Sequence, residues 1–178
     1  MAANKTNRFD EVIAQEEKHI KKHVIESIVE DQPGVLQKIA GLFARRGFNI
    51  ETITVGKTMQ SGLSKMIIVV EGDDSVLEKV EKQMNKLIDT VKVISIPEKE
   101  RIARELCLVK VNLSRKNAKE EVMNYANVYK TKIVDITLKT ATIEIIGEPE
   151  KIDSFLDLMK QYGIADVSRT GITAIRRG

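Results

Sequence analysis

One stretch of this chain, residues 24–56, constrains its fold more than any other. It opens with the apolar run Val24–Val29 and passes through an acidic segment to a Pro-Gly pair at 33–34. The apolar pairs that follow recur at the spacing of one helix face: Val35/Leu36, Ile39/Ala40 and Leu42/Phe43. Gly47 suits the end of that helix, and the β-branched run Ile50–Val55 predicts a returning strand. The stretch therefore predicts strand, polar loop, helix and strand, in that order.

The next residues complete this first unit. The elements predicted there are a hairpin turn at Ser61-Gly62, a buried strand at Met66–Val70, a helix capped by Asp73 or Asp74 with its inward face from Val76 to Ile88, and a strand at Val91–Ile96. The resulting order βαββαβ is that of a ferredoxin-like unit.

The second half repeats this order without obvious sequence identity to the first. Its predicted elements are a strand at Arg104–Leu113, a helix at Ala118–Tyr129, strands at Ile133–Leu138 and Thr142–Ile146, a helix from Pro149, and a last strand at Ile164–Ile175. The fold class expected is α+β, with two ferredoxin-like units in tandem and antiparallel sheets that carry their helices on one face. The domains expected are a polar extension at 1–20, a first unit at 21–97, a linker at 98–103 and a second unit at 104–178.

Composition narrows the function classes. The chain is 42% hydrophobic and 31% charged, which suits a soluble globular protein, and no apolar stretch is long enough to span a membrane. A net charge of +3 without a strongly basic segment gives no reason to expect nucleic-acid binding, and the aromatic residues fall mainly in predicted helices. One cysteine and the absence of a secretory signal predict a cytoplasmic protein.

Six groups of residues resemble a known family. They are Glu30–Leu36, Gly41–Phe43 with Arg46–Glu51, Leu63–Met66, Glu81–Leu87, Arg104-Glu105-Leu106 with Leu108–Val111, and Arg169-Thr170-Gly171. The first two resemble an ACT domain, and the ordered set resembles the small, regulatory subunit of acetolactate synthase (acetohydroxyacid synthase) from about residue 22 to the C-terminus. Residues 1–20 lie outside the resemblance and read as a mobile extension or a docking arm.

The loop before the first helix has chemistry of its own. Backbone N–H groups at a helix start lack partners within the helix and attract anions, so an amino-acid carboxylate is a natural ligand there. Gly34 would let such a ligand approach the backbone, and Asp31 could receive its ammonium group. The alternative is an ordinary helix start in which Asp31 or Gln32 caps the first turn.

The resemblance implies an effector, its binding positions and two protein partners. It implies that a branched-chain amino acid, typically valine, binds between the ACT domains of two neighbouring chains and inhibits the catalytic subunit. The positions that match the effector motif are Asp31, Gln32, Pro33, Gly34, Val35, Leu36, Asn49 and Ile50. Familiar members often carry Asn where this chain has Asp31. The partners implied are a second copy of the chain and the large catalytic subunit. That subunit would hold thiamine diphosphate, magnesium and in many members flavin, while this non-catalytic chain would hold no cofactor and no metal.

Other readings remain open on the residues alone. A free-standing amino-acid sensor with another partner would share the ACT features. His19 and His23 are four residues apart and would share a helix face, but nothing completes a metal site, so surface histidines are expected. Cys107 lies in an apolar strand and is expected to be a core thiol. No nucleophile, acid–base set or phosphate loop indicates an independent enzyme.

Overall fold

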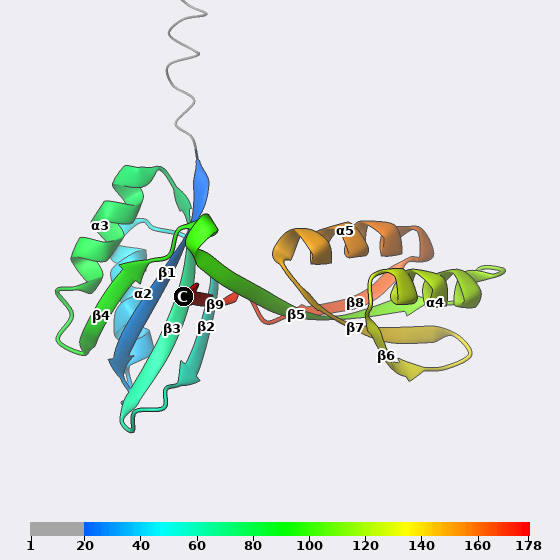
Figure 1. Ribbon diagram of the computed structural model, residues 1–178, viewed down its shortest axis with the longest axis horizontal. Helices are drawn as coiled ribbons and strands as arrows, with labels where there is room; N and C mark the ends of the chain where they lie inside the picture. Colours follow the sequence, from blue (N-terminus) through cyan, green and yellow to red (C-terminus); the bar gives the residue numbers. More distant parts are fainter. Residues whose placement is uncertain (1–19) are drawn as a thin grey trace, which may run out of the picture. The chain divides into compact units, whose positions relative to one another are not determined.

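The computed structural model describes residues 20–178, which form two compact units that divide between Glu98 and Lys99 (Figure 1). The expected N-terminal extension lies outside the described residues, apart from Ile20. Lys21 and Lys22 already belong to the first strand.

The first unit is a four-stranded antiparallel sheet with two helices on one face (Figure 1). Its elements are β1 Lys21–Glu30, α2 Val35–Arg46, β2 Ile50–Lys57, β3 Leu63–Gly72, α3 Asp74–Met84 and β4 Thr90–Ser95. The strand order β2-β3-β1-β4 places β1 and β3 in the centre and leaves β2 and β4 at the edges. Asp73 caps α3 as expected, because its side chain accepts a hydrogen bond from the backbone N–H of Val76 at 3.0 Å.

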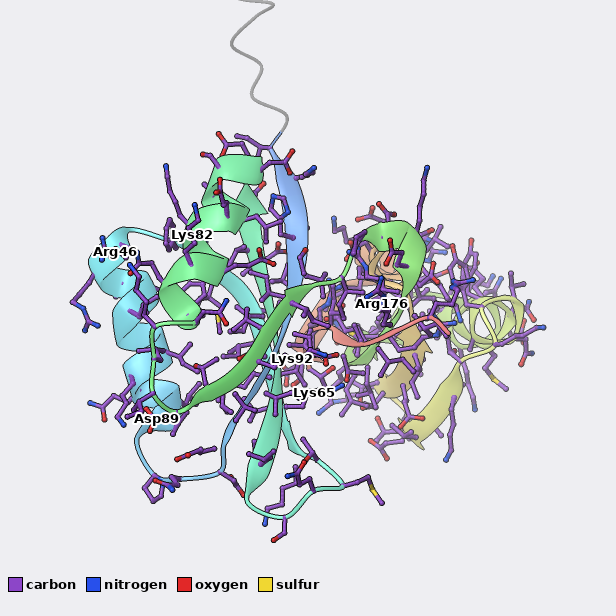
Figure 2. The ribbon with its side chains drawn as sticks, turned by 60° about the vertical axis from the view of Figure 1, so that its left-hand side comes forward. Arg46, Lys65, Lys82, Asp89, Lys92 and Arg176 are labelled. Carbon is purple, nitrogen blue, oxygen red and sulfur yellow. The ribbon has the colours of Figure 1, made fainter. Side chains whose placement is uncertain are left out.

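Alternation along the central strands builds the core of this unit. Ile25 and Val29 of β1 point to the helices together with Met66, Ile68 and Val70 of β3. They meet the apolar stripes of the helices, to which Ile39, Phe43, Val80 and Met84 belong. Figure 2 shows Arg46 and Asp89 at opposite ends of α2, which runs back along the sheet against the direction of β1.

The second unit repeats the topology. The 3-10 turn Glu98–Glu100 spans the division between the units. The elements that follow are β5 Arg101–Asn112, α4 Ala118–Val128, β6 Lys132–Ile136, β7 Thr140–Gly147, α5 Pro149–Met159, the 3-10 turn Lys160–Tyr162, β8 Ile164–Arg169 and β9 Thr173–Arg176. The strand order β6-β7-β5-β8 matches that of the first sheet, and α4 and α5 cover one face (Figure 1). The expected fold class is confirmed.

The chain departs from expectation at its last strand. The stretch predicted as one strand from Ile164 to Ile175 is broken at Gly171, whose φ of 81° turns the backbone. The new strand β9 pairs with Arg101–Arg104, the first residues of β5. Residues 101–103, expected in a linker, therefore lie in a strand. In the first unit α3 also ends earlier than expected, at Met84.

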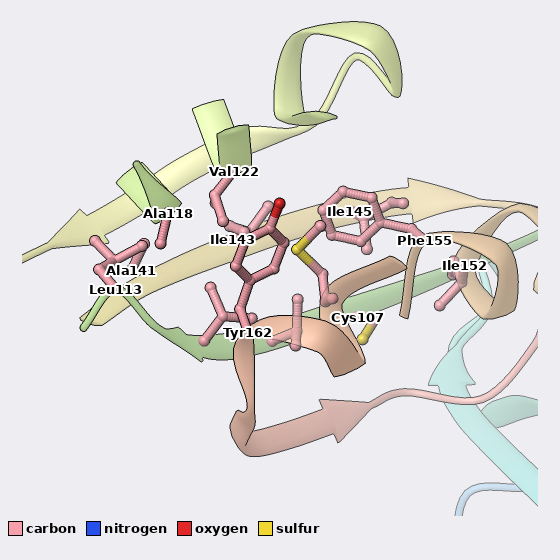
Figure 3. Close-up of a cluster of buried hydrophobic side chains, with 13 residues drawn as sticks. Cys107, Leu113, Ala118, Val122, Ala141, Ile143, Ile145, Ile152, Phe155 and Tyr162 are labelled. Carbon is pink, nitrogen blue, oxygen red and sulfur yellow. The ribbon is translucent and has the colours of Figure 1, made fainter. Parts of the chain in front are cut away.

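The core of the second unit lies between its sheet and its two helices (Figure 3). Cys107 is fully buried there, as expected for a core thiol, and burial raises the pKa of its side chain. Tyr162 closes one side of the core, and its hydroxyl donates a hydrogen bond to Glu121 at 2.7 Å. Apolar packing therefore holds the two helices to the sheet, and the partly buried Tyr162–Glu121 bond connects the 3-10 turn after α5 to α4.

An ion-pair cluster explains two of the sequence motifs. The Arg169 guanidinium donates two hydrogen bonds of 2.7 Å to the Glu105 carboxylate and one of 2.6 Å to Asp153 of α5. Glu105 is only 4% exposed, and the bonds to its carboxylate raise the pKa of Arg169 further above its ordinary range. The cluster joins β5, β8 and α5 at the point where the chain turns toward β9.

We expect Arg169→Met to lower the unfolding free energy by about 3–5 kcal/mol, because it leaves the buried Glu105 carboxylate without its partner. The matched control is Arg176→Met, which breaks a surface pair with Glu100 and should cost at most about 1 kcal/mol. Denaturant unfolding of both variants measures the difference. Equal losses in the two variants would contradict the structural role of the buried pair.

We also expect stability to fall steeply in alkali because of Tyr162. Burial, with the bond to Glu121, raises its pKa from 10.0 to about 12, so the folded chain holds this proton while the unfolded chain releases it. The unfolding free energy should therefore decline as the pH rises from 10 to 12, and Tyr162→Phe should remove that part of the decline. Absorbance at alkaline pH should show one tyrosine of three ionising last. Simultaneous ionisation of all three would contradict the assignment.

Candidate functional site

The loop that joins β1 to α2 starts its helix with a glycine. Gly34 is the N-cap residue and has φ 89° and ψ −12°, in the left-handed region that glycine adopts without the steric cost of a side chain. The backbone N–H of Lys38 bonds to the Gly34 carbonyl at 2.9 Å, which makes Gly34 the first acceptor of the helix. The sequence predicted this loop and its glycine at the same positions.

The helix start is left uncapped by side chains. Gly34 supplies no capping bond, and the first turn of α2 holds no acidic residue. The Asp31 carboxylate instead accepts a hydrogen bond from the Ser64 hydroxyl at 3.2 Å, so Asp31 does not cap the helix. The N–H of Val35 bonds to the Gln32 carbonyl at 3.4 Å, and no side chain caps the other N–H groups of the first turn. Together with the helix dipole, those N–H groups favour an anion beside the loop.

The space at this helix start is open. A Cβ atom on Gly34 would meet no heavy atom within 4 Å, and all four residues 31–34 are exposed. Leu36 in the first turn is 47% exposed, and Val55 of β2 is 45% exposed. Val55 lies on the helix-bearing face because its partner across the sheet is Met66, a core residue beneath the helices. The open end thus combines an anion-favouring backbone with exposed aliphatic side chains.

Val55 is a candidate site residue that the sequence alone does not indicate. The alternation of Ile53 and Val55 was visible, but the register of β2 against β3 was not. That register decides that Val55 faces the helices near the end of the sheet from which α2 starts.

Asn49 and Ile50 lie away from the loop within one chain. They follow the C-terminal end of α2, while Gly34 precedes its N-terminal end, and a helix of 12 residues is roughly 18 Å long. Ile50 pairs with Val70, near the end of β3 that is opposite to the loop. The structure therefore brings residues 31–36 together and leaves Asn49 and Ile50 at the other end of the unit.

Three contacts fix the loop to its neighbours. The N–H of Glu30 bonds to the Asp89 carbonyl at 2.9 Å, and the N–H of Asp31 bonds to the Gly62 carbonyl at 2.8 Å. The Lys38 ammonium donates to both oxygens of the Asp89 carboxylate, at 2.8 and 2.9 Å. The loop between β1 and α2, the hairpin between β2 and β3, and the loop between α3 and β4 thus meet at one end of the unit.

The other candidate sites have weaker structural support. His19 lies outside the described residues, and His23 is buried rather than at the surface as expected, because its Nε2 atom lies 3.1 Å from the Gly72 carbonyl oxygen. Within residues 20–178 no three His, Cys, Asp or Glu side chains gather as metal ligands would. A shallow groove beside α5 includes Asp153 and Asp157, but both carboxylates are already paired with cations of the same unit.

Two family models match separate parts of the chain. The ACT domain of acetohydroxyacid synthase small subunits and similar proteins matches residues 25–92, and the small subunit of acetolactate synthase matches residues 104–178. The chain is also 47% identical over 156 residues to the probable acetolactate synthase small subunit of Methanothermobacter thermautotrophicus, across 88% of this chain and 93% of that protein. The chain belongs to the acetolactate synthase small-subunit family.

Other members of the acetolactate synthase small-subunit family are also similar to this chain in sequence and structure. The small subunit of Mycolicibacterium smegmatis is 39% identical over 156 residues, which cover 88% of this chain and 91% of that protein. The crystal structure of the small subunit from Thermotoga maritima matches with a TM-score of 0.83 at 40% identity, and the match covers 89% of this chain and 99% of that one.

Membership of the small-subunit family confirms the resemblance seen in the sequence. A small subunit implies a large catalytic subunit as its partner. The match over residues 104–178 favours this reading over a free-standing sensor, because the second unit belongs to the same family as the first. Among residues 20–178, none of the helices has both the length and the apolar character that crossing a membrane requires.

Proposed function

We propose that this chain is a regulatory subunit of acetolactate synthase that binds valine, or a related branched-chain amino acid, between two of its ACT units. Binding there would inhibit the catalytic subunit when the amino-acid product of the pathway is abundant, which is feedback inhibition. The observation that carries the proposal is the uncapped start of α2 at Gly34, which is open, exposed and free of acidic residues in its first turn.

Each part of an amino acid finds a partner at this loop. The carboxylate fits the free N–H groups of the first turn of α2. The ammonium group fits the Asp31 carboxylate, whose other hydrogen-bond partner is the Ser64 hydroxyl. The aliphatic side chain fits the exposed surfaces of Leu36 and Val55. The carboxylate and the ammonium group of such a ligand would both have hydrogen-bond partners, and its aliphatic side chain would be removed from water.

A second copy of the chain accounts for Asn49 and Ile50. The strand β2 is an edge strand, and its backbone groups are open to pairing with another strand. A twofold axis would pair β2 with β2 of the partner in antiparallel direction. In that arrangement the start of one β2, where Asn49 and Ile50 lie, falls beside the end of the other, where the loop lies. Pairing through β4, the opposite edge, would not bring them together.

Regulation would follow from a site that two chains share. A ligand that contacts both copies favours the arrangement in which both halves of the site are present. The catalytic subunit, as the proposed holder of thiamine diphosphate, magnesium and flavin, would respond to that arrangement, while this chain supplies no reacting group. The coupling free energy between two such sites is typically about 1–3 kcal/mol.

We expect Gly34→Asp to abolish valine inhibition while leaving dimerisation and folding intact. Aspartate tolerates left-handed backbone better than most residues and can itself bond to the first-turn N–H groups. Its carboxylate would repel that of the ligand, and two like charges about 4 Å apart repel by about 1–4 kcal/mol, so binding should weaken by about fivefold to about a thousandfold. Calorimetric titration with valine, leucine and isoleucine, and inhibition of the assembled enzyme, measure the loss.

The control for Gly34→Asp is Gly34→Asn, which has the same size and backbone tolerance without the charge. It should bind valine more strongly than the aspartate variant. Valine inhibition of wild-type strength in Gly34→Asp would exclude this loop as the site. Failure of the wild-type chain to bind any of the three amino acids would overturn the proposed effector class.

We expect mixing of two defective chains to restore binding, because each site would take its loop from one chain and Asn49 from the other. Gly34→Asp and Asn49→Ala homodimers should each bind weakly. A hybrid dimer holds one intact site of two, so random mixing of equal amounts should restore about a quarter of the wild-type sites. Titration before and after subunit exchange measures the recovery. No recovery after exchange would show that Asn49 and the loop do not share a site across the twofold axis.

A further inference from the structure

One partly buried ion pair, between Lys38 and Asp89, lies beside the candidate loop and takes no part in the binding site as proposed. Asp89, in the loop between α3 and β4, has a carboxylate side chain that is only 10% exposed. The Lys38 ammonium, from the second turn of α2, donates to both of its oxygens at 2.8 and 2.9 Å. These residues are 51 positions apart in the sequence, so the pair is a tertiary contact. Figure 2 shows Asp89 at the end of α2 that is opposite to Arg46.

Asp89 holds both ends of the loop. Its backbone carbonyl accepts the N–H of Glu30, the last residue before the loop. Its carboxylate holds Lys38, whose own N–H bonds to the Gly34 carbonyl at 2.9 Å. Between these two points Asp31 makes two further contacts, from its N–H to the Gly62 carbonyl at 2.8 Å and from its carboxylate to the Ser64 hydroxyl at 3.2 Å. Asp89 is therefore the residue that connects the end of β1 to α2, while Gly62 and Ser64 hold Asp31.

We infer that Asp89 and Lys38 are a positioning pair for effector binding, an inference that rests on the proposed function of the loop. The pair fixes where the free N–H groups of α2 lie relative to Asp31, and so fixes how well one amino acid spans the two. Lys38 also keeps its charge on Asp89 and away from the helix start. Neither residue contacts the ligand in this scheme, because both act through the loop.

The same unit contains a matched control. Glu26 of β1 has a carboxylate that is also 10% exposed, and Lys65 of β3 donates to it at 2.9 Å. This pair is of the same chemical type and its carboxylate is equally buried, with the Lys65 side chain 34% exposed against 53% for Lys38. Glu26 lies in the middle of β1, and its side chain bonds to neither end of the loop. Loss of either pair removes a partly buried Lys–carboxylate contact. Only loss of Lys38–Asp89 removes a side-chain contact that connects α2 to the residue bonded to the end of β1.

The test compares Asp89→Asn with Glu26→Gln in the full chain. Each change keeps the shape of the side chain and removes its charge, and Asp89→Asn also keeps the backbone carbonyl that bonds to Glu30. Valine binding is measured by calorimetry, and unfolding free energy by denaturant titration. We expect both variants to lose stability to a similar degree, and Asp89→Asn alone to bind valine roughly 5- to 30-fold more weakly, the change that 1–2 kcal/mol produces.

Lys38→Met supplies a second measurement. If the two residues act as a pair, the double variant Lys38→Met with Asp89→Asn should bind no more weakly than the worse of the two single variants. Additive losses would overturn the pairing, and equal effects of Asp89→Asn and Glu26→Gln on valine binding would overturn the positioning role while leaving the site itself in place. If the wild-type chain binds no branched-chain amino acid, the proposed function fails first, and the two failures are thereby distinguished.

Discussion

The free start of one helix is the constraint on which the first unit depends. A helix start with unpaired N–H groups is costly unless water, a side chain or a ligand satisfies it, and most helices use a capping side chain. Here the N-cap is Gly34, the first turn holds no acid, and Asp31 bonds to Ser64 instead. Contacts to Asp89 and Gly62 hold the surrounding backbone in place. The loop is thus rigid where it joins the fold and open where a ligand would bind.

The second unit has the same topology, but the start of its first helix differs from that of α2. Its first helix also starts from a residue with positive φ, Asn117 at 64°, and also lacks a side-chain cap. Its first turn, however, contains Glu120 and Glu121, whose negative charges interact favourably with the positive end of the helix dipole. Glu121 is held in turn by Tyr162 and by Arg115, whose guanidinium lies 4.9 Å from the ring centre of Tyr162. The repeated fold therefore has no acidic residue in the first turn of α2 in the first unit and two in the first turn of α4 in the second.

How far the sequence predicts this protein depends on the range of the interactions involved. Apolar periodicity is local, so the strands, the helices and their order were predictable, as was the contiguous loop around Gly34. The pairing of β9 with Arg101–Arg104 was not, because one long strand and two short ones share the same apolar pattern. Val55 and Asp89 were missed for a related reason: strand register and contacts between distant loops leave no local trace. His23 was taken for a surface residue because its partner, the Gly72 carbonyl, is distant in sequence.

The separation of Asn49 from Gly34 affects how ligand binding at the proposed site could depend on a second chain. A site complete within one chain could bind a ligand whatever the arrangement of its neighbours. A site divided between the two ends of α2 is complete only when a second chain brings its Asn49 to the first chain's loop. In the proposed dimer, ligand binding would be linked to the paired state and would stabilise it more as the ligand concentration rises. The length of one helix, set by 12 residues between two glycines, would in this way make an amino-acid site sensitive to how two chains are arranged.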